Sequence, residues 1–216
     1  MIGRIVGVVA MVVLAALLIW RLDVNGWGSL LWAGSGIATS VIRSPHEARN
    51  KQNTIARQDR QGIERVLLIG VMLGGSVIPL VHLLTGVFSF ADYDLPWWAT
   101  ALSLLLVIPG LWLFHRSHTD LGRNWSVTTE LRDDHTLVAS GVYERIRHPM
   151  YSAIWLIFLA YPLMIHNWVA GFAVIVAFGA MYVIRVPYEE AMMVDRFGDE
   201  YRTYAEETGR LVPPLR

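Results

Sequence analysis

The sequence of 216 residues contains no cysteine. The chain therefore forms no disulfide, no thiolate zinc site and no cysteine nucleophile. It also lacks an excess of charge of one sign, since 18 basic residues balance 18 acidic ones. General binding to nucleic acid is disfavoured, because it needs a basic patch that stands out from its acidic neighbours.

Long apolar blocks dominate what is present. Apolar residues make up 54% of the chain, and short charged segments separate the blocks. This distribution is typical of a polytopic membrane protein. The apolar blocks are residues 2–20, 27–42, 66–90, 97–114, 151–165 and 168–184. We therefore expect an all-α, polytopic integral membrane bundle of about six transmembrane helices.

The two N-terminal blocks differ from the other four. Block 2–20 resembles a signal peptide, but its apolar core exceeds the usual length of about 7–15 residues and no clear cleavage site follows, which favours an uncleaved span. Block 27–42 is short and rich in small residues, which favours close packing against neighbouring helices. We accordingly divide the chain into an N-terminal helical hairpin with a polar cytoplasmic segment, 1–64, and a four-helix core with its loop and tail, 65–216.

Block 66–90 carries two local features. Gly70 and Gly74 have the small-xxx-small spacing that lets helices approach closely. Pro79 lies in the same block, and we expect it to bend the helix.

Basic residues predict the orientation in the membrane. Segment 43–65 holds six of them, loop 115–147 holds five and tail 185–216 holds five, whereas the breaks at 91–96 and 166–167 hold none. The positive-inside rule places these three segments and both termini in the cytoplasm. The loop 115–150 and the C-terminal tail then meet on one face, where we expect a cytoplasmic cofactor pocket at the membrane boundary.

The stretch "RIRHPMY", Arg145–Tyr151, places charge and proline at the start of an apolar block. Its simplest interpretation is a basic anchor followed by a proline in the first turn of a helix. A second charged group, at Arg185 and Glu189, follows the last block. These two residues are four apart, so on a helix they share one side.

Three motifs now identify a resemblance. "LGRNWS" (121–126), "HTLVASGVYERIRHPMY" (135–151) and "RVPYEEAMMVDRFGDEYRTY" (185–204) resemble the isoprenylcysteine carboxyl methyltransferase family and the related phospholipid methyltransferases. The resemblance covers about the C-terminal half of the chain. It implies an integral membrane enzyme that uses S-adenosyl-L-methionine to methylate a lipophilic acceptor entering from the bilayer. The chain has no G-x-G-x-x-G after a strand, which agrees with a pocket built from loop and tail instead of a Rossmann fold.

The resemblance also implies which residues bind the cofactor. Carried over to this sequence, they are Thr128, His135, Leu137, Val138, Tyr143, His148, Pro149, Tyr151, Glu189 and Glu190. Pro149 would start a helix whose free N–H groups suit the cofactor's carboxylate. Tyrosine faces can hold a sulfonium by cation–π attraction. Glu189 can accept hydrogen bonds from either the ribose or the amino group, and both partners stay open.

Arg185 and Glu189 are the candidate catalytic residues. A carboxylate acceptor is already ionised at neutral pH and needs only alignment with the sulfonium methyl group, which a planar guanidinium provides. The alternative for Arg185 is a snorkelling anchor at the end of a span.

No metal site is expected. His115 and His118 are three apart, but membrane oxygenases need several more histidines in such clusters. His82 lies within an apolar block, where a neutral histidine bonded to a neighbouring helix is the simpler interpretation.

Two other functions remain open from the sequence. One is a steroid-reductase-like, NADPH-dependent membrane reductase, and the other is a non-enzymatic membrane scaffold. The acceptor is also open, among a prenylcysteine, an isoprenoid acid, a phospholipid amine and other lipophilic molecules. A single lysine among many arginines, with no cysteine, suggests a prokaryotic cytoplasmic membrane. Oligomeric state has no signal in the sequence.

Overall fold

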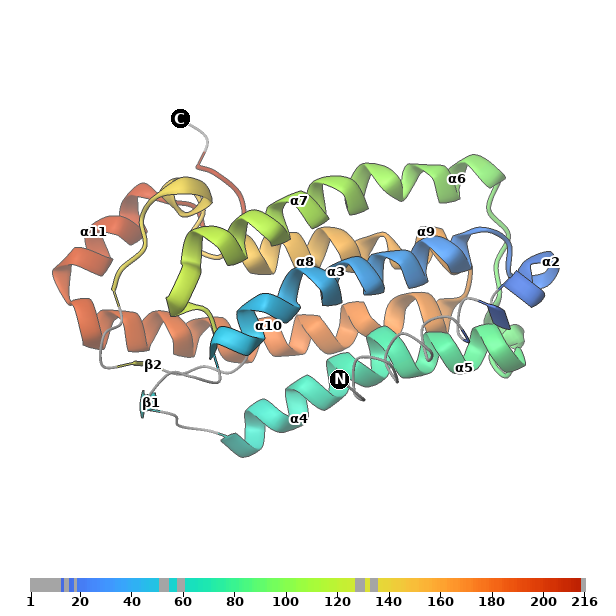
Figure 1. Cartoon of the computed structure of the whole chain (residues 1–216), viewed down its shortest axis with the longest axis horizontal. Helices are drawn as coiled ribbons and strands as arrows, with labels where there is room; N and C mark the ends of the chain where they lie inside the picture. Colours follow the sequence, from blue (N-terminus) through green and yellow to red (C-terminus); the bar gives the residue numbers. More distant parts are fainter. Residues whose placement is uncertain are drawn as a thin grey trace.

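The structure is a computed structural model that describes residues 13, 16–17, 19–50, 55–57, 61–126, 131–132 and 136–214. Most of the predicted first span, 2–20, lies outside the described residues. The helices are α2 (Leu22–Asn25), α3 (Gly28–Asn50), α4 (Gln61–Met72), α5 (Ile78–Thr85), α6 (Trp97–Leu102), α7 (Leu104–Leu121), α8 (Pro149–Leu159), α9 (Tyr161–Met164), α10 (Trp168–Phe197) and α11 (Asp199–Glu207). The long helices lie lengthwise in an elongated bundle (Figure 1).

One short pair of strands departs from the all-α prediction. β1 (Ile55–Arg57) and β2 (Leu131–Arg132) pair antiparallel, with an irregular register. Runs of two and three residues are too short to give the alternating pattern by which strands are recognised in a sequence. The pair joins the polar segment after α3 to the loop after α7.

Three helical segments of the described chain are long and apolar enough to cross a membrane. They are Gly62–Thr85, Trp97–Leu121 and Trp168–Phe197, and Pro149–Met164 is a shorter apolar helix. Their outer faces carry large apolar side chains, since Val66, Leu105 and Val176 are 69%, 70% and 72% exposed. The protein is therefore an integral membrane protein, whereas the count of six spans stays a prediction.

Three helices extend further than the apolar blocks that predicted them, since α3 continues past 42 to Asn50 and two others behave alike. α7 does not end at 114 but continues to Leu121, and α10 does not end at 184 but continues to Phe197. Each ends at a glycine with positive φ, Gly122 at 56° and Gly198 at 57°. Glycine adopts this conformation without the penalty that a Cβ atom brings, so the glycines and not the polar residues end the helices.

Close packing of the segment from α4 to α5 against α10 follows the predicted glycines. A Cβ atom on Gly74 would lie 2.9 Å from the backbone of Ala173, whereas one on Gly70 would make an ordinary contact at 3.9 Å with Ala177. A π-helix, Leu73–Val77, immediately precedes Pro79. Proline has no N–H for the carbonyl four residues earlier, Gly75, and Trp32 of α3 donates its indole N–H to that oxygen at 3.3 Å.

The bundle end near α2, α5 and α6 is closed by a short turn before α10. Asn167 caps α10, because its side-chain oxygen accepts from the N–H groups of Val169 and Ala170 at 2.9 and 2.8 Å. Its amide nitrogen donates to the Phe88 carbonyl and to Asp92 Oδ1, both at 2.6 Å. The predicted hairpin of two apolar blocks is thus held tightly.

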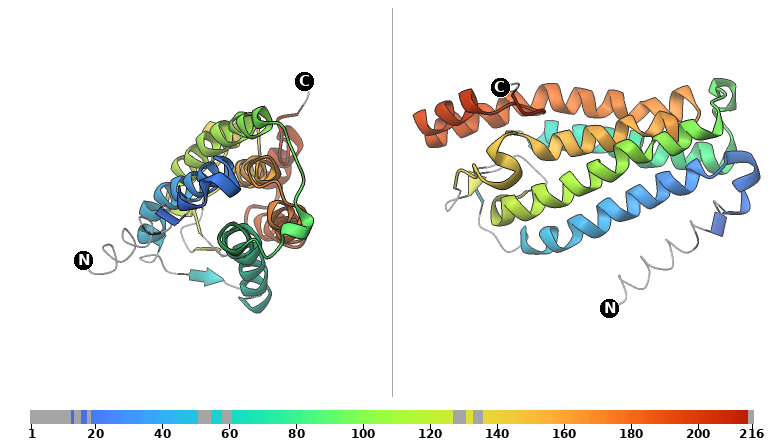
Figure 2. Two further views of the ribbon diagram at one scale, coloured as in Figure 1. Left: turned by 90° about the vertical axis from the view of Figure 1, so that its right-hand side faces the viewer. Right: turned by 90° about the horizontal axis from the view of Figure 1, so that it is seen from above.

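The opposite end of the bundle carries the polar chain. The loop between α7 and α8 and the C-terminal helix α11 both lie there, beside the C-terminal part of α10 (Figures 1 and 2). α3 packs against α7 and α9, so its C-terminal end also reaches this region.

Candidate active site

The predicted motif at Arg145–His148 lies against the C-terminal tail and is hydrogen-bonded to it. Ile146 and Gly209 form a parallel bridge. The N–H groups of Arg147 and His148 donate to the carbonyls of Gly209 and Arg210 at 2.8 and 3.0 Å. His148, with φ −124° and ψ 58°, lies outside the helical region, as expected because proline disfavours the helical conformation in the residue that precedes it. α8 then begins at Pro149, as predicted.

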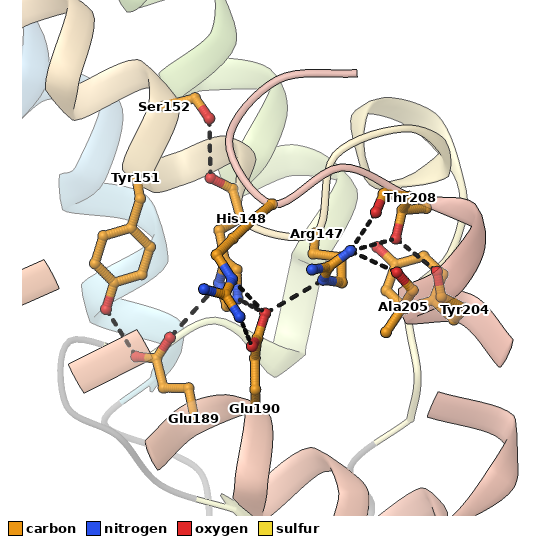
Figure 3. Close-up of polar contacts among 10 residues, drawn as sticks. Arg147, His148, Tyr151, Ser152, Glu189, Glu190, Tyr204, Ala205 and Thr208 are labelled. Atoms are coloured by element: carbon orange, nitrogen blue, oxygen red, sulfur yellow. Dashed lines mark hydrogen bonds and ion pairs between the residues drawn. The ribbon is translucent and has the colours of Figure 1, made fainter. Parts of the chain in front are cut away.

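Arg147 fastens the loop to the tail by its side chain. Its Nη1 donates to the carbonyls of Ala205, at 2.7 Å, and Thr208. Its Nε donates to Glu190 Oε1 at 3.2 Å (Figure 3). One guanidinium therefore satisfies the C-terminal end of α11 and a carboxylate on α10 together, which only a multi-donor group can do.

Glu190 sits within three basic side chains. Besides Arg147, His148 Nε2 lies 3.2 Å from Glu190 Oε1. Arg210 donates through Nε at 3.1 Å and through Nη2 at 2.5 Å, and these bonds to Glu190 raise the pKa of Arg210. This cluster therefore joins the loop before α8, the helix α10 and the C-terminal tail.

Glu189, one residue earlier, faces a different set of partners. Tyr151 donates its hydroxyl to Glu189 Oε1 at 2.9 Å, and Arg185 Nε donates to the same oxygen at 2.7 Å. His148 Nδ1 lies 3.8 Å from Glu189 Oε2. Glu64 of α4, buried at 6% exposure, places Oε1 3.6 Å from Arg185 Nε. A guanidinium between two carboxylates thus occupies the point where α4, α8 and α10 meet.

A cavity of about 240 Å³ lies beside these groups. Its walls come from the loop after α7, from α8, from α10 and α11, and from single positions on α3 and α4. The lining residues are Arg43, Leu68, Leu121, Asn124, Trp125, Ser126, Thr136, Leu137, Val138, Tyr143, Arg147, His148, Met150, Tyr151, Ile154, Met181, Arg185, Glu189, Met192, Met193, Tyr201 and Tyr204. Apolar and aromatic side chains with a few charged groups are the usual lining of a small-molecule site.

Several tyrosines at the cavity are held neutral by burial. Tyr143 donates to the Ser117 carbonyl at 3.3 Å, and its own carbonyl accepts from Tyr204 at 2.7 Å. Burial raises the pKa of Tyr143 above its usual value, and it raises that of Tyr204 to about 12 although Arg147 opposes the shift. These rings therefore offer neutral aromatic surface near neutral pH, which is the form that attracts a cation by its face.

The structure brings most of the predicted site residues to one place. Leu137, Val138, Tyr143, His148, Tyr151, Arg185 and Glu189 all line the cavity. Pro149 and Glu190 do not line it: Pro149 is fully buried at the start of α8, and Glu190 lies in the adjoining basic cluster. Thr128 and His135 lie outside the described residues.

Sequence reasoning missed two charged residues at the site. Glu64 and Arg43 stand at the edges of apolar blocks, where they read as ordinary solvated or anchoring charges. Glu64 has Arg60 four residues before it and Arg65 beside it, so its neighbours in the sequence gave no signal that a partner lies elsewhere. For Arg43 the sequence contains no such signal.

Comparisons with known proteins point to one group. A family model described as phospholipid methyltransferase matches residues 98–200. The chain is 28% identical to protein-S-isoprenylcysteine O-methyltransferase A of Arabidopsis thaliana over 139 residues, which cover 63% of this chain and 71% of the plant protein. It is 30% identical to protein-S-isoprenylcysteine O-methyltransferase of Mus musculus over 121 residues, 55% of this chain and 43% of the mouse protein.

A solved structure has a similar fold. The structure of the eukaryotic intramembrane Ras methyltransferase ICMT (isoprenylcysteine carboxyl methyltransferase) matches 93% of this chain and 73% of its own chain, with a TM-score of 0.54 and 18% identity. At this identity the match shows the membrane fold. The resemblance predicted from the three motifs is confirmed by these comparisons together.

Proposed function

From the premise that the chain is an isoprenylcysteine carboxyl methyltransferase-like membrane enzyme, we propose that it transfers a methyl group from S-adenosyl-L-methionine to the carboxylate of a lipophilic acceptor. The observation that carries this proposal is the contact between the two motif segments. Tyr151 of the loop–helix motif and Glu189 of the tail motif share a 2.9 Å hydrogen bond at one cavity.

The residues at the cavity fit the cofactor chemically. A sulfonium needs neutral aromatic faces and a nearby anion, and the lining offers tyrosines, Trp125 and the Glu189 carboxylate. An adenosine group needs apolar walls with a few hydrogen-bonding groups, and Leu137, Val138 and Asn124 are of these kinds. We propose that this set, with Tyr143, His148 and Tyr151, holds the cofactor.

In this reaction the protein has to position the two reactants and does not have to transfer a proton. When bound, the cofactor supplies an electrophilic methyl group, which passes from sulfur to a carboxylate oxygen and leaves a methyl ester and neutral S-adenosylhomocysteine. The positive sulfonium and the negative carboxylate cancel, so no proton is transferred and no general base is needed. The protein's own task is to bind the two reactants in line and to exclude water.

Arg185 and Glu189 are proposed to act at the reacting end of the cavity. Glu189 holds Arg185 by its Nε at 2.7 Å, and the planar guanidinium held in this way is the group proposed to align an acceptor carboxylate. Tyr151 also donates to Oε1 of Glu189, so two donors hold this glutamate in place. Residues locked in this way lose little further freedom when the reactants bind.

Position in the membrane supports a lipophilic acceptor. The cavity lies where three segments able to span a bilayer reach the polar end of the bundle, and methionine and aliphatic side chains form part of its wall. The proposed orientation places this end in the cytoplasm of a prokaryotic cell, with the acceptor entering from the bilayer. The named acceptor of the plant and mouse relatives is an isoprenylcysteine, so an S-prenylcysteine is the first acceptor to test.

The test combines transfer with cofactor binding. Purified protein is incubated with methyl-labelled S-adenosylmethionine and either an S-prenylcysteine or total membrane lipid. The proposal predicts a labelled product that releases volatile methanol in alkali, as an ester does and an N-methyl amine does not. Binding of NADPH without binding of S-adenosylhomocysteine would instead favour a reductase, and binding of neither would favour a scaffold.

A further inference from the structure

The charge of Arg185 is already matched within the protein. Its Nε lies 2.7 Å from Glu189 and 3.6 Å from Glu64, and the side chain is only 10% exposed. Both contacts are with carboxylates, so the positive charge of Arg185 is offset within the protein before an acceptor enters the cavity. An acceptor carboxylate would approach like charges there, which disfavours its binding. A carboxylate acceptor therefore needs a further cation.

Arg43 of α3 is the remaining arginine of the cavity lining that could supply it, since Arg147 is occupied by the tail and Glu190. Arg43 belongs to the N-terminal part of the chain, far in sequence from the motifs. Its guanidinium carbon lies 5.8 Å from the centroid of the Phe114 ring on α7, close enough for cation–π attraction to orient it.

The Arg43 side chain has unused hydrogen-bonding capacity. Its nearest acid, Glu47, places Oε1 4.0 Å from Nε, which is too far for a hydrogen bond. Within the described part of the chain, Arg43 Nε is buried and has no hydrogen-bond partner. Buried donors in proteins are nearly always hydrogen-bonded, and the Arg43 side chain, which is 40% exposed at the cavity wall, can donate from Nε to a ligand that enters the cavity.

The surroundings of Arg43 match a molecule with an apolar body and an anionic end. Leu68 of α4 and Ile154 of α8 line the same cavity, and Arg43 directly follows the apolar run 27–42 of α3. A cation placed beside aliphatic walls, where the apolar stretch of a helix ends, suits a lipophilic carboxylate better than a water-soluble anion.

We propose that Arg43 is an acceptor-binding residue, which supplies the positive charge that holds the lipophilic carboxylate beside Arg185. This inference rests on the proposed function and names its acceptor site. It also gives α3 a role in specificity, since an acceptor without a negative charge loses the contact with Arg43. The alternative use of Arg43 is a membrane-boundary anchor where the apolar stretch of α3 ends, with its guanidinium over the Phe114 ring.

The experiment compares Arg43→Gln and Arg43→Lys with the matched control Arg65→Gln in the full-length protein. Arg65 is exposed near the start of α4 and does not line the cavity. Each protein is assayed for methylation of an S-prenylcysteine with a free carboxylate. Equilibrium binding of that compound and of its carboxamide is measured separately, together with binding of S-adenosylhomocysteine.

Arg43→Gln is expected to weaken acceptor binding and raise its KM by about tenfold or more, the effect of losing a charge-assisted hydrogen bond. Its preference for the carboxylate over the carboxamide is lost, whereas affinity for S-adenosylhomocysteine changes less than about twofold, since only the acceptor contact is removed. Arg43→Lys is expected to bind the acceptor with an affinity between those of the wild type and Arg43→Gln. Lysine keeps the positive charge, but its ammonium group lacks the planar array of donors of a guanidinium. Arg65→Gln matches the wild type.

Two outcomes separate this inference from the proposed function. If the wild type methylates the compound and a stably folded Arg43→Gln protein has an unchanged KM and carboxylate preference, the role of Arg43 is wrong and the methyltransferase proposal stands. If the wild type transfers no methyl group yet binds the carboxylate in a way that depends on Arg43, the proposed reaction is wrong and the anion site stands. Should Arg43→Gln fail to fold, equal binding of carboxylate and carboxamide by the wild type overturns the inference.

Discussion

At the residue scale, two neighbouring glutamates have different partners and different roles at the site. Glu189 faces the cavity with Tyr151 and Arg185, and Glu190 faces Arg147, His148 and Arg210. Consecutive residues of a helix point in different directions, so Glu189 faces the cavity whereas Glu190 faces the basic cluster that joins the loop to the tail. The sequence resemblance treated both as cofactor contacts, which the cavity lining supports for Glu189 alone.

Removing the Tyr151 hydroxyl should weaken cofactor binding modestly. Tyr151→Phe keeps the ring but removes the bond to Glu189, and we expect affinity for S-adenosylhomocysteine to fall by about two- to tenfold, the range for one hydrogen bond. Titration calorimetry measures this. The control is Tyr93→Phe, which loses a 2.7 Å bond to the Pro162 carbonyl at the other end of the bundle. Equal losses of affinity in both variants would refute a specific role for Tyr151.

Arg147 and Arg145 allow a matched test of the loop–tail contact. Arg147 binds Glu190 and two carbonyls of the tail, with its side chain 12% exposed, whereas Arg145 is exposed. Arg147→Lys keeps the charge but cannot reach all these acceptors, so the free energy of unfolding should fall by about 2 kcal/mol. Arg145→Lys should change it by less than about 0.5 kcal/mol. Thermal unfolding in detergent measures both, and similar melting temperatures would contradict the assignment.

Some residue contacts could be predicted and others could not. The Arg185–Glu189 bond follows from a spacing of four on a helix, and it is present at 2.7 Å. The contact of Glu64 with Arg185 joins residues more than a hundred positions apart, and Arg43 shares the cavity with residues as distant in sequence as Tyr204. Single-sequence periodicity reports only neighbours along one element, so tertiary contacts of this kind leave no local pattern.

At the element scale, the segment 62–85 shows how glycine position sets helix contact. Gly74 has no room for a Cβ atom, which would lie 2.9 Å from the Ala173 backbone, whereas Gly70, one turn earlier, has an ordinary contact at 3.9 Å. The sequence predicted close packing through both. The structure assigns the closest approach to Gly74 alone.

These two glycines give a direct comparison. Gly74→Ala should lower the free energy of unfolding by about 1–3 kcal/mol, because the backbone of α10 must move to admit the methyl group. Gly70→Ala should be neutral or stabilising by up to about 1 kcal/mol, since alanine favours a helix and the space exists. The melting temperatures of the two variants test this difference in stability. A Gly70→Ala protein less stable than Gly74→Ala would show that the packing is assigned to the wrong residue.

The sequence predicted which long helices exist, but it did not predict where they end. Apolar blocks located every described long helix, yet α7 and α10 continue seven and thirteen residues past the block ends at 114 and 184. Hydropathy reports where a chain meets lipid, whereas a helix stops where backbone geometry demands it, here at Gly122 and Gly198. The pair β1–β2 was missed because its strands are too short to show alternation.

At the scale of the whole molecule, the predicted cytoplasmic position of the polar end can be tested with single cysteines, since the native chain has none. Arg202→Cys lies exposed on α11, and Asp94→Cys lies exposed in the turn at the opposite end. The excess of basic residues at the polar end predicts that a membrane-impermeant maleimide labels Asp94→Cys in intact cells. Arg202→Cys should react only after the cells are opened, and the reverse pattern would overturn the orientation.

The division at residue 64 also stays a prediction, and the structure adds physical links across it. Trp32 of α3 donates to Gly75, β1 pairs with β2, and Arg43 lines the cavity of the core. The N-terminal part therefore contributes to packing and to the proposed acceptor site, although no motif of the resemblance lies within it.

The central claim is that the loop motif and the tail motif form one pocket for S-adenosylmethionine. A structure of the full-length protein determined with S-adenosylhomocysteine tests it most directly. The account predicts that the ligand occupies the cavity between α8, α10 and α11, in contact with Tyr151 and Glu189. Ligand bound at another place, or none at saturating concentration, would contradict it.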